Sequence, residues 1–214
     1  MKPLLVLRPE PGNSATAARA RAMGLDAVQC PLFEIEPVGW TTPDAASFDY
    51  VLLTSANALR HGGMGLAALT TLDALAVGAA TADAALGAGF RVAMAGDSGI
   101  DALLAALPGE RRLLHLAGAD RYRPATRHRI ERIVVYRSVP VVALIPSGQH
   151  VALVHSPRAG ARLADLAPDR ADIAIAAISP AAASACGTGW VTLEAVEQPD
   201  ETALLALAAR LCQD

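Results

Sequence analysis

The chain has 214 residues, so it can form one large domain or two domains of about 100 residues each. Apolar residues make up 53% of it, yet both long uncharged stretches contain prolines and polar side chains, which argues against a membrane-spanning helix. The net charge of −3 argues against a nucleic-acid partner, and no secretory leader opens the sequence, so we expect a cytoplasmic protein.

In chain order, short apolar runs alternate with Ala/Leu-rich stretches of helical length. Ten strands are predicted, at Leu4–Leu7, Ala27–Ile35, Tyr50–Leu53, Leu75–Val77, Arg91–Met94, Leu113–Leu116, Ile133–Tyr136, Val151–Val154, Ile173–Ile178 and Val191–Leu193. Helices are predicted at Ala15–Met23, Thr81–Leu86, Ile100–Leu107 and Glu201–Cys212. This alternation is typical of βαβ units, in which helices cover both faces of a parallel sheet.

A weak internal repeat predicts two domains. The segment Asp49–Asn57 resembles Val151–Arg158, and Ala76–Ala82 resembles Ala177–Ala183. The counterpart of the first strand, near Leu113, comes late in the middle of the chain, as it would in a circularly permuted copy. We therefore predict an α/β protein of two flavodoxin-like, doubly wound parallel-sheet domains joined by a two-stranded linker. The first is discontinuous, residues 1–36 plus 140–214, and residues 37–139 are inserted into it.

Common cofactor and metal sites are not indicated. The cysteines Cys30, Cys186 and Cys212 are far apart, and the five histidines lack metal-ligand spacing. Glycine-rich phosphate loops and a G-x-S-x-G turn are also missing from the sequence. We expect an enzyme without metal or cofactor, which would act by positioning a small-molecule substrate.

Small and polar residues follow the predicted strands, where parallel sheets bind their ligands. Backbone N–H groups in such turns can hold anions. The candidate substrate-binding residues are Arg8, Ser55, Ala56, Asn57, Gly78, Thr81, Gly118, Arg121, Ser156, Arg158 and Ser179. Helix capping alone would explain any single turn, whereas six such turns together favour a ligand between two domains.

Arginine is concentrated in one part of the chain. Eight arginines lie between Glu110 and Arg137, accompanied by only three acidic residues. A solvated face is one interpretation of this segment. The other is an anion-binding rim, because the planar guanidinium group binds carboxylates well.

Four motifs occur in a specific order: a strand ending in Leu7-Arg8-Pro9, the segment Asp49–Asn57, the turn Val77–Ala82, and the strand end Val134–Arg137. Together they resemble the uroporphyrinogen-III synthase family over nearly the whole chain. The resemblance implies a bilobed fold and a cyclising lyase of haem biosynthesis. Its substrate would be hydroxymethylbilane, a linear tetrapyrrole polycarboxylate, which closes with loss of water and inversion of ring D to give uroporphyrinogen III.

The resemblance also implies a role for Tyr136, which matches a tyrosine that family members place in the cleft. This residue would be the general acid for departure of the hydroxyl group, and packing at the hinge is the alternative. Ser179–Ala183 departs from the family's G-x-x-T-A turn. Two other functions therefore stay open: a non-catalytic, bilobed ligand-binding or regulatory homologue, and a different two-domain α/β transferase. We expect a monomer in each case.

Overall fold

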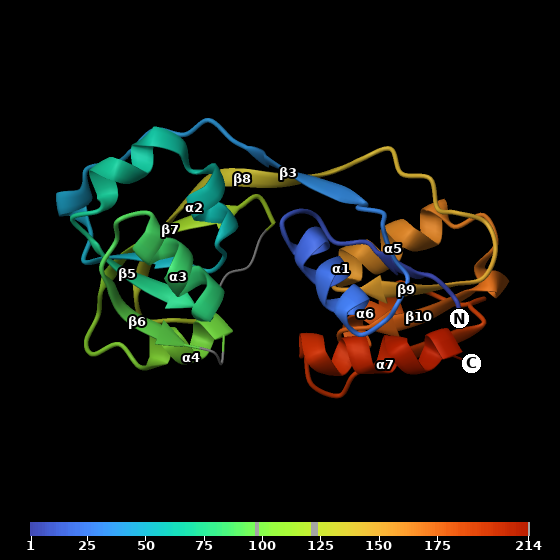
Figure 1. The fold of residues 1–214 in the computed structure, drawn as a ribbon. Helices are drawn as coiled ribbons and strands as arrows, with labels where there is room; N and C mark the ends of the chain where they lie inside the picture. Colours follow the sequence, from blue (N-terminus) through green and yellow to red (C-terminus); the bar gives the residue numbers. More distant parts are fainter. Residues whose placement is uncertain (97–98, 121–123, 214) are drawn as a thin grey trace. The chain divides into compact units, whose positions relative to one another are not determined.

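The computed structural model describes residues 1–96, 99–120 and 124–213 (Figure 1). It divides into two compact units. Unit 1 consists of Met1–Glu34 and Val139–Asp214, and unit 2 consists of Ile35–Ser138. The sequence placed these boundaries at 36/37 and 139/140. Among the described residues, no helix combines the length and the hydrophobicity that a membrane span requires.

Unit 1 is built on a five-stranded parallel sheet of order β11-β10-β9-β1-β2. Its strands are β1 (Leu4–Val6), β2 (Ala27–Gln29), β9 (His150–Val154), β10 (Ile173–Ala177) and β11 (Thr192–Ala195). The helices are α1 (Gly12–Ala22), α5 (Pro157–Leu166), α6 (Pro180–Ala185) and α7 (Glu201–Gln213), with a short 3-10 helix, η3 (Arg170–Asp172).

Strand β1 shows why this sheet is buried on both faces. Leu4 and Val6 belong to a core cluster that includes residues of α1 and α7. Leu5 and Leu7 point to the opposite face, where the cluster includes residues of α5 and α6. Because successive side chains of a strand alternate between faces, a strand covered on both sides must be continuously apolar.

Unit 2 is built on a sheet of order β3-β8-β7-β4-β5-β6. Its strands are β3 (Phe33–Pro37), β4 (Tyr50–Leu53), β5 (Asp73–Val77), β6 (Val92–Gly96), β7 (Arg112–Gly118) and β8 (Arg129–Pro140). The α-helices are α2 (Asn57–His61), α3 (Ala79–Gly87) and α4 (Gly99–Ala105), and the 3-10 helices are η1 (Ala45–Ser47) and η2 (Gly63–Leu69). Strands β4 to β8 are parallel to one another. Residues of α4 cover the opposite face of the sheet from those of α2 and α3.

The two sheets have the same strand order. Counted along the chain, the strands of unit 1 run 2-1-3-4-5. Strands β4 to β8 of unit 2 give the same order when β7 and β8 are counted first. In both units β-strands and helices alternate along the chain, which is the mixed α/β architecture that the sequence predicted.

One predicted strand is wrong. The run Ala27–Ile35 forms two strands, β2 and β3, which belong to different sheets. Pro31 lies between them, and a proline cannot donate a ladder hydrogen bond within a strand. Strand β8 is also much longer than the predicted Ile133–Tyr136. The prediction was too short because only the middle of β8 shows an apolar pattern, whereas many of its other residues are polar and at least partly exposed.

Candidate functional site

A pocket of about 230 Å³ lies at the carboxyl edge of the sheet in unit 2. Strands β4, β5, β7 and β8 contribute their ends, and α4 contributes one side chain. The lining residues are Thr54, Val77, Ile100, His115, Ala117, Gly118, Ala119, Asp120, Arg132, Tyr136 and Ser138. This is the edge at which parallel α/β sheets bind ligands, because the loops after the strands gather there.

Tyr136 is held in the pocket by the backbone of β7. Gly118 is its register partner across a β-bulge, and the N–H of Ala119 donates a 2.9 Å hydrogen bond to the Tyr136 carbonyl. A Cβ atom on Gly118 would stand 2.7 Å from Cε2 and Cζ of the Tyr136 ring and 2.9 Å from Oη. In the described part of the chain, the Tyr136 hydroxyl group has no hydrogen-bond partner, so it is available to a ligand.

The close approach at Gly118 gives a first prediction. Gly118→Ala should displace the Tyr136 ring, because an aromatic side chain cannot give way by several tenths of an ångström without rotating as a whole. We expect turnover to fall about ten-fold, the cost of about 1.4 kcal/mol in transition-state stabilisation. Steady-state kinetics would measure the loss. Gly87→Ala is the matched control, since a Cβ there meets nothing within 4 Å, and equal activity of the two variants would contradict the prediction.

His115 is a buried polar residue of β7, and it shares the pocket with Tyr136. Its Nε2 lies 3.0 Å from Oγ1 of Thr54, at the end of β4. Arg132 is its register partner on the neighbouring strand β8. Burial, together with the positive charge of Arg132, lowers the pKa of His115 to about 4. The imidazole is therefore neutral near pH 7 and forms a polar, uncharged wall beside Tyr136.

Arg132 supplies positive charge to the pocket. Its Nη2 donates hydrogen bonds to the carbonyl oxygens of Gly118 and Asp120, the latter at 2.9 Å. These two bonds fix the guanidinium group over the end of β7. A guanidinium group that is held in this way is suited to binding a carboxylate.

The other candidate residues of unit 2 lie next to the pocket lining. Ser55, Ala56 and Asn57 follow Thr54, and Gly78 follows Val77. The Ser55 hydroxyl accepts a 3.2 Å hydrogen bond from the Asn57 N–H, which is a local turn contact. Gly78 precedes α3 with a φ of 84°, a conformation that favours glycine. Thr81 is buried in α3.

In unit 1 the candidate residues have partners of their own. Ser156 and Ser179 cap α5 and α6, each accepting a 3.2 Å hydrogen bond from a backbone N–H. These two hydroxyl groups therefore act as helix caps. The guanidinium group of Arg158 lies 4.5 Å from the centre of the Phe33 ring, and Arg8 is paired with Glu201. Arg121 lies outside the described residues.

Sequence reasoning missed several pocket residues, chiefly Thr54, His115 and Arg132. The one available signal was His115, a polar residue between Leu114 and Leu116 in an otherwise apolar strand. The described residues contain no group of three or more His, Cys, Asp or Glu side chains that could hold a metal ion.

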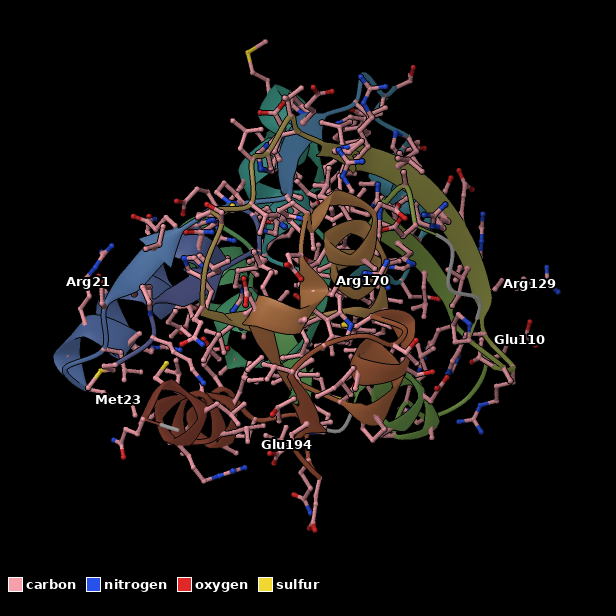
Figure 2. The ribbon with its side chains drawn as sticks, turned by 90° about the vertical axis from the view of Figure 1, so that its right-hand side faces the viewer. Arg21, Met23, Glu110, Arg129, Arg170 and Glu194 are labelled. Atoms are coloured by element: carbon pink, nitrogen blue, oxygen red, sulfur yellow. The ribbon has the colours of Figure 1, made fainter. Side chains whose placement is uncertain are left out.

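Most of the described arginines near β7 and β8 contact unit 2 itself. Arg129 and Glu110 lie side by side (Figure 2), with Nε 2.9 Å from a carboxylate oxygen. Arg137 donates two hydrogen bonds to Glu36, and Arg127 donates to backbone carbonyl groups. Arg132 alone among the described arginines lines the pocket. Among the described arginines of this segment, the anion-binding interpretation therefore concerns Arg132, and Arg121 and Arg123 lie outside the described residues.

Comparison with known proteins decides the family. The model of the family "Uroporphyrinogen-III synthase HemD" matches residues 14–206. The chain belongs to the uroporphyrinogen-III synthase family. This confirms the resemblance seen in the sequence and identifies the chain as a cyclising lyase of tetrapyrrole biosynthesis. A search of curated proteins gave no significant match.

Solved structures of synthases share the fold. The uroporphyrinogen-III synthetase of Helicobacter pylori matches with a TM-score of 0.69 at 16% identity, over 99% of this chain and 100% of that one. A mutant uroporphyrinogen III synthase of the extremely thermophilic bacterium Thermus thermophilus matches with a TM-score of 0.57 at 18% identity, over 99% of both chains. At these identities the comparison shows a common fold.

Proposed function

We propose that this synthase carries out its chemistry at the unit 2 pocket and that Tyr136 is the general acid. The observation that carries the proposal is the Tyr136 hydroxyl group, which has no partner among the described residues and lines a pocket with Arg132 and the neutral His115. A hydroxyl group with its proton free to transfer is what departure of a hydroxyl leaving group requires.

The reaction of the family can be assigned to this arrangement. Tyr136 protonates the terminal hydroxyl group of hydroxymethylbilane, the C–O bond breaks, and departure of water leaves an electrophilic azafulvenium cation and the Tyr136 phenolate. The substituted carbon of ring D attacks it and forms a spiro intermediate. This cationic intermediate breaks and recloses with ring D inverted, and return of a proton to the Tyr136 phenolate gives uroporphyrinogen III. The protein favours the crowded attack by holding one folded conformation of the substrate.

The size of the pocket indicates which part of the substrate it holds. At about 230 Å³ it is smaller than the roughly 300–1,000 Å³ of sites that enclose drug-sized ligands. We propose that the pocket binds one end of the tetrapyrrole and that Arg132 pairs with one of the substrate carboxylates. The other carboxylates would bind strand-end turns: Arg8, Ser156, Arg158 and Ser179 of unit 1, and Ser55, Ala56, Asn57, Gly78, Thr81 and Gly118 of unit 2.

The common strand order supports the predicted domain organisation. The order 2-1-3-4-5 is that of flavodoxin-like sheets. We propose two flavodoxin-like domains, residues 1–36 plus 140–214 and residues 37–139, with the second circularly permuted. A monomeric state, a cytoplasmic location, independence of cofactors and the lack of a nucleic-acid partner stay predictions.

A turnover assay tests the proposed function. The purified protein should consume many equivalents of hydroxymethylbilane, much faster than the spontaneous closure in buffer. A ligand-binding homologue would bind the tetrapyrrole but leave the rate of consumption unchanged, and an unrelated transferase would do neither. Either of these results would contradict the proposal.

A further inference from the structure

A cluster of four side chains lies at the carboxyl edge of the sheet in unit 1. The carboxylate of Glu201, at the start of α7, accepts hydrogen bonds from Thr16 Oγ1 at 2.5 Å and His155 Nε2 at 3.1 Å. Arg8 Nη1 lies 3.3 Å from the same carboxylate and 3.4 Å from Thr16 Oγ1. Arg8 and His155 follow the adjacent strands β1 and β9, and Thr16 belongs to α1.

Glu201 is kept ionised in this cluster. Burial acts to raise the pKa of the Glu201 carboxyl group. The hydrogen bonds from His155 and Thr16 and the charges of His155 and Arg8 together outweigh burial and lower the pKa to about 2. Near pH 7 a fixed negative charge therefore stands beside the Arg8 guanidinium group.

Arg8 is held on two sides and open on a third. Among the described residues, only its Nη1 makes hydrogen bonds. Gly12, the first residue of α1, lies so close that a Cβ there would be 2.4 Å from Nε, 2.7 Å from Cζ and 2.9 Å from Nη2. The Arg8 side chain is still 37% exposed. The guanidinium group is therefore oriented, and its Nε and Nη2 donors remain free to bind a ligand.

We infer that Glu201, supported by Thr16 and His155, is a positioning residue that fixes the Arg8 guanidinium group for binding a carboxylate of the substrate. The inference rests on the proposed function, in which Arg8 binds the tetrapyrrole. Arginine loses much rotamer freedom when it binds a ligand, so orienting it beforehand reduces the entropy lost at that moment. Gly12 belongs to the same arrangement because any side chain there would displace the guanidinium group.

The test is a double-mutant cycle with steady-state kinetics. Glu201→Gln should raise KM for hydroxymethylbilane about three- to ten-fold and change kcat less than about two-fold, because orientation of a binding group is lost but the chemistry in unit 2 is not. In an Arg8→Gln background, Glu201→Gln should have no further effect on KM. A purely structural role of Glu201 would give effects that add.

Asp200→Asn is the matched control. It removes the same charge one residue away, where Asp200 contacts the N–H of Ala203 and does not contact Arg8, so KM should stay at the wild-type value. Gly12→Ala is a second route to the same result if Glu201→Gln folds poorly. The added Cβ meets the far end of a flexible side chain, so the fold should survive while KM rises as in Glu201→Gln.

Two results would overturn the inference: an unchanged KM in both Glu201→Gln and Gly12→Ala, or additive effects of Arg8→Gln and Glu201→Gln. Both would be seen with a wild-type protein that turns over normally, so the proposed function would stand. Failure of the wild-type protein to turn over hydroxymethylbilane would instead remove the function on which the inference rests.

Discussion

Tyr136→Phe should lower kcat about 100-fold and leave KM within about three-fold of the wild-type value. General acids contribute roughly 10²–10⁴-fold to rate, and phenylalanine removes the transferable proton while keeping the ring. The ring should stay packed against Gly118, so the pocket should keep its shape and its affinity. The expected loss therefore appears in kcat, as it does when an interaction made in the transition state is removed.

Steady-state kinetics with the spontaneous closure subtracted would measure this effect. Tyr50→Phe is the matched control, because Tyr50 lies at the opposite, amino-terminal end of β4 in the same unit. It should leave both kinetic constants unchanged. A wild-type kcat in the Tyr136→Phe variant would contradict the role of Tyr136 as general acid. Tyr136 would then be a packing residue.

The second large effect concerns acid stability. The pKa of His115 is about 4 in the folded protein against a usual value of 6.5. Stability from the neutral imidazole is therefore fully present above pH 6.5 and is lost as the pH falls toward 4. The full change in pKa corresponds to roughly 3–4 kcal/mol, since one pKa unit is about 1.4 kcal/mol. His115→Gln should flatten the pH dependence of unit 2 stability in this window.

Urea unfolding at several pH values between 4 and 7 would measure this difference. Trp40 belongs to unit 2, where its Nε1 donates to the Gly62 carbonyl, and Trp190 belongs to unit 1. A Trp190→Phe background would therefore make fluorescence report on unit 2. Glu201 also has a lowered pKa, but protonation of its carboxylate reduces stability only below pH 4.5 and affects unit 1. It should therefore contribute little to the pH dependence measured for unit 2. Equal pH profiles with and without His115 would contradict the prediction.

Much of the fold could be predicted because its physical cause is local. Leu4, Leu5 and Val6 are all apolar, as a strand covered on both faces must be, and this pattern located most strands. The division of Ala27–Ile35 between two sheets could not be seen in this way. It depends on which strands lie beside β2 and β3, and an apolar run carries no information about its neighbours.

The site was predicted less completely for the same reason. A family motif predicted Tyr136 and a strand-end turn predicted Gly118, and both residues line the pocket. His115 and Arg132 become pocket residues only because β7 and β8 pair in a register that places them side by side. In unit 1, the pairing of Arg8 with Glu201 joins residues 193 positions apart, a contact that no local pattern indicates.

The isomer composition of the product tests the central claim most directly. That claim is that the side chains and turns of this chain, without a cofactor, direct the ring closure. An excess of protein, dialysed against a chelator, should be mixed with hydroxymethylbilane. The cyclic products should then be oxidised to porphyrins and separated by chromatography. We predict that nearly all of the product is the type III isomer, whereas the type I isomer in the proportion formed in buffer alone would contradict the account.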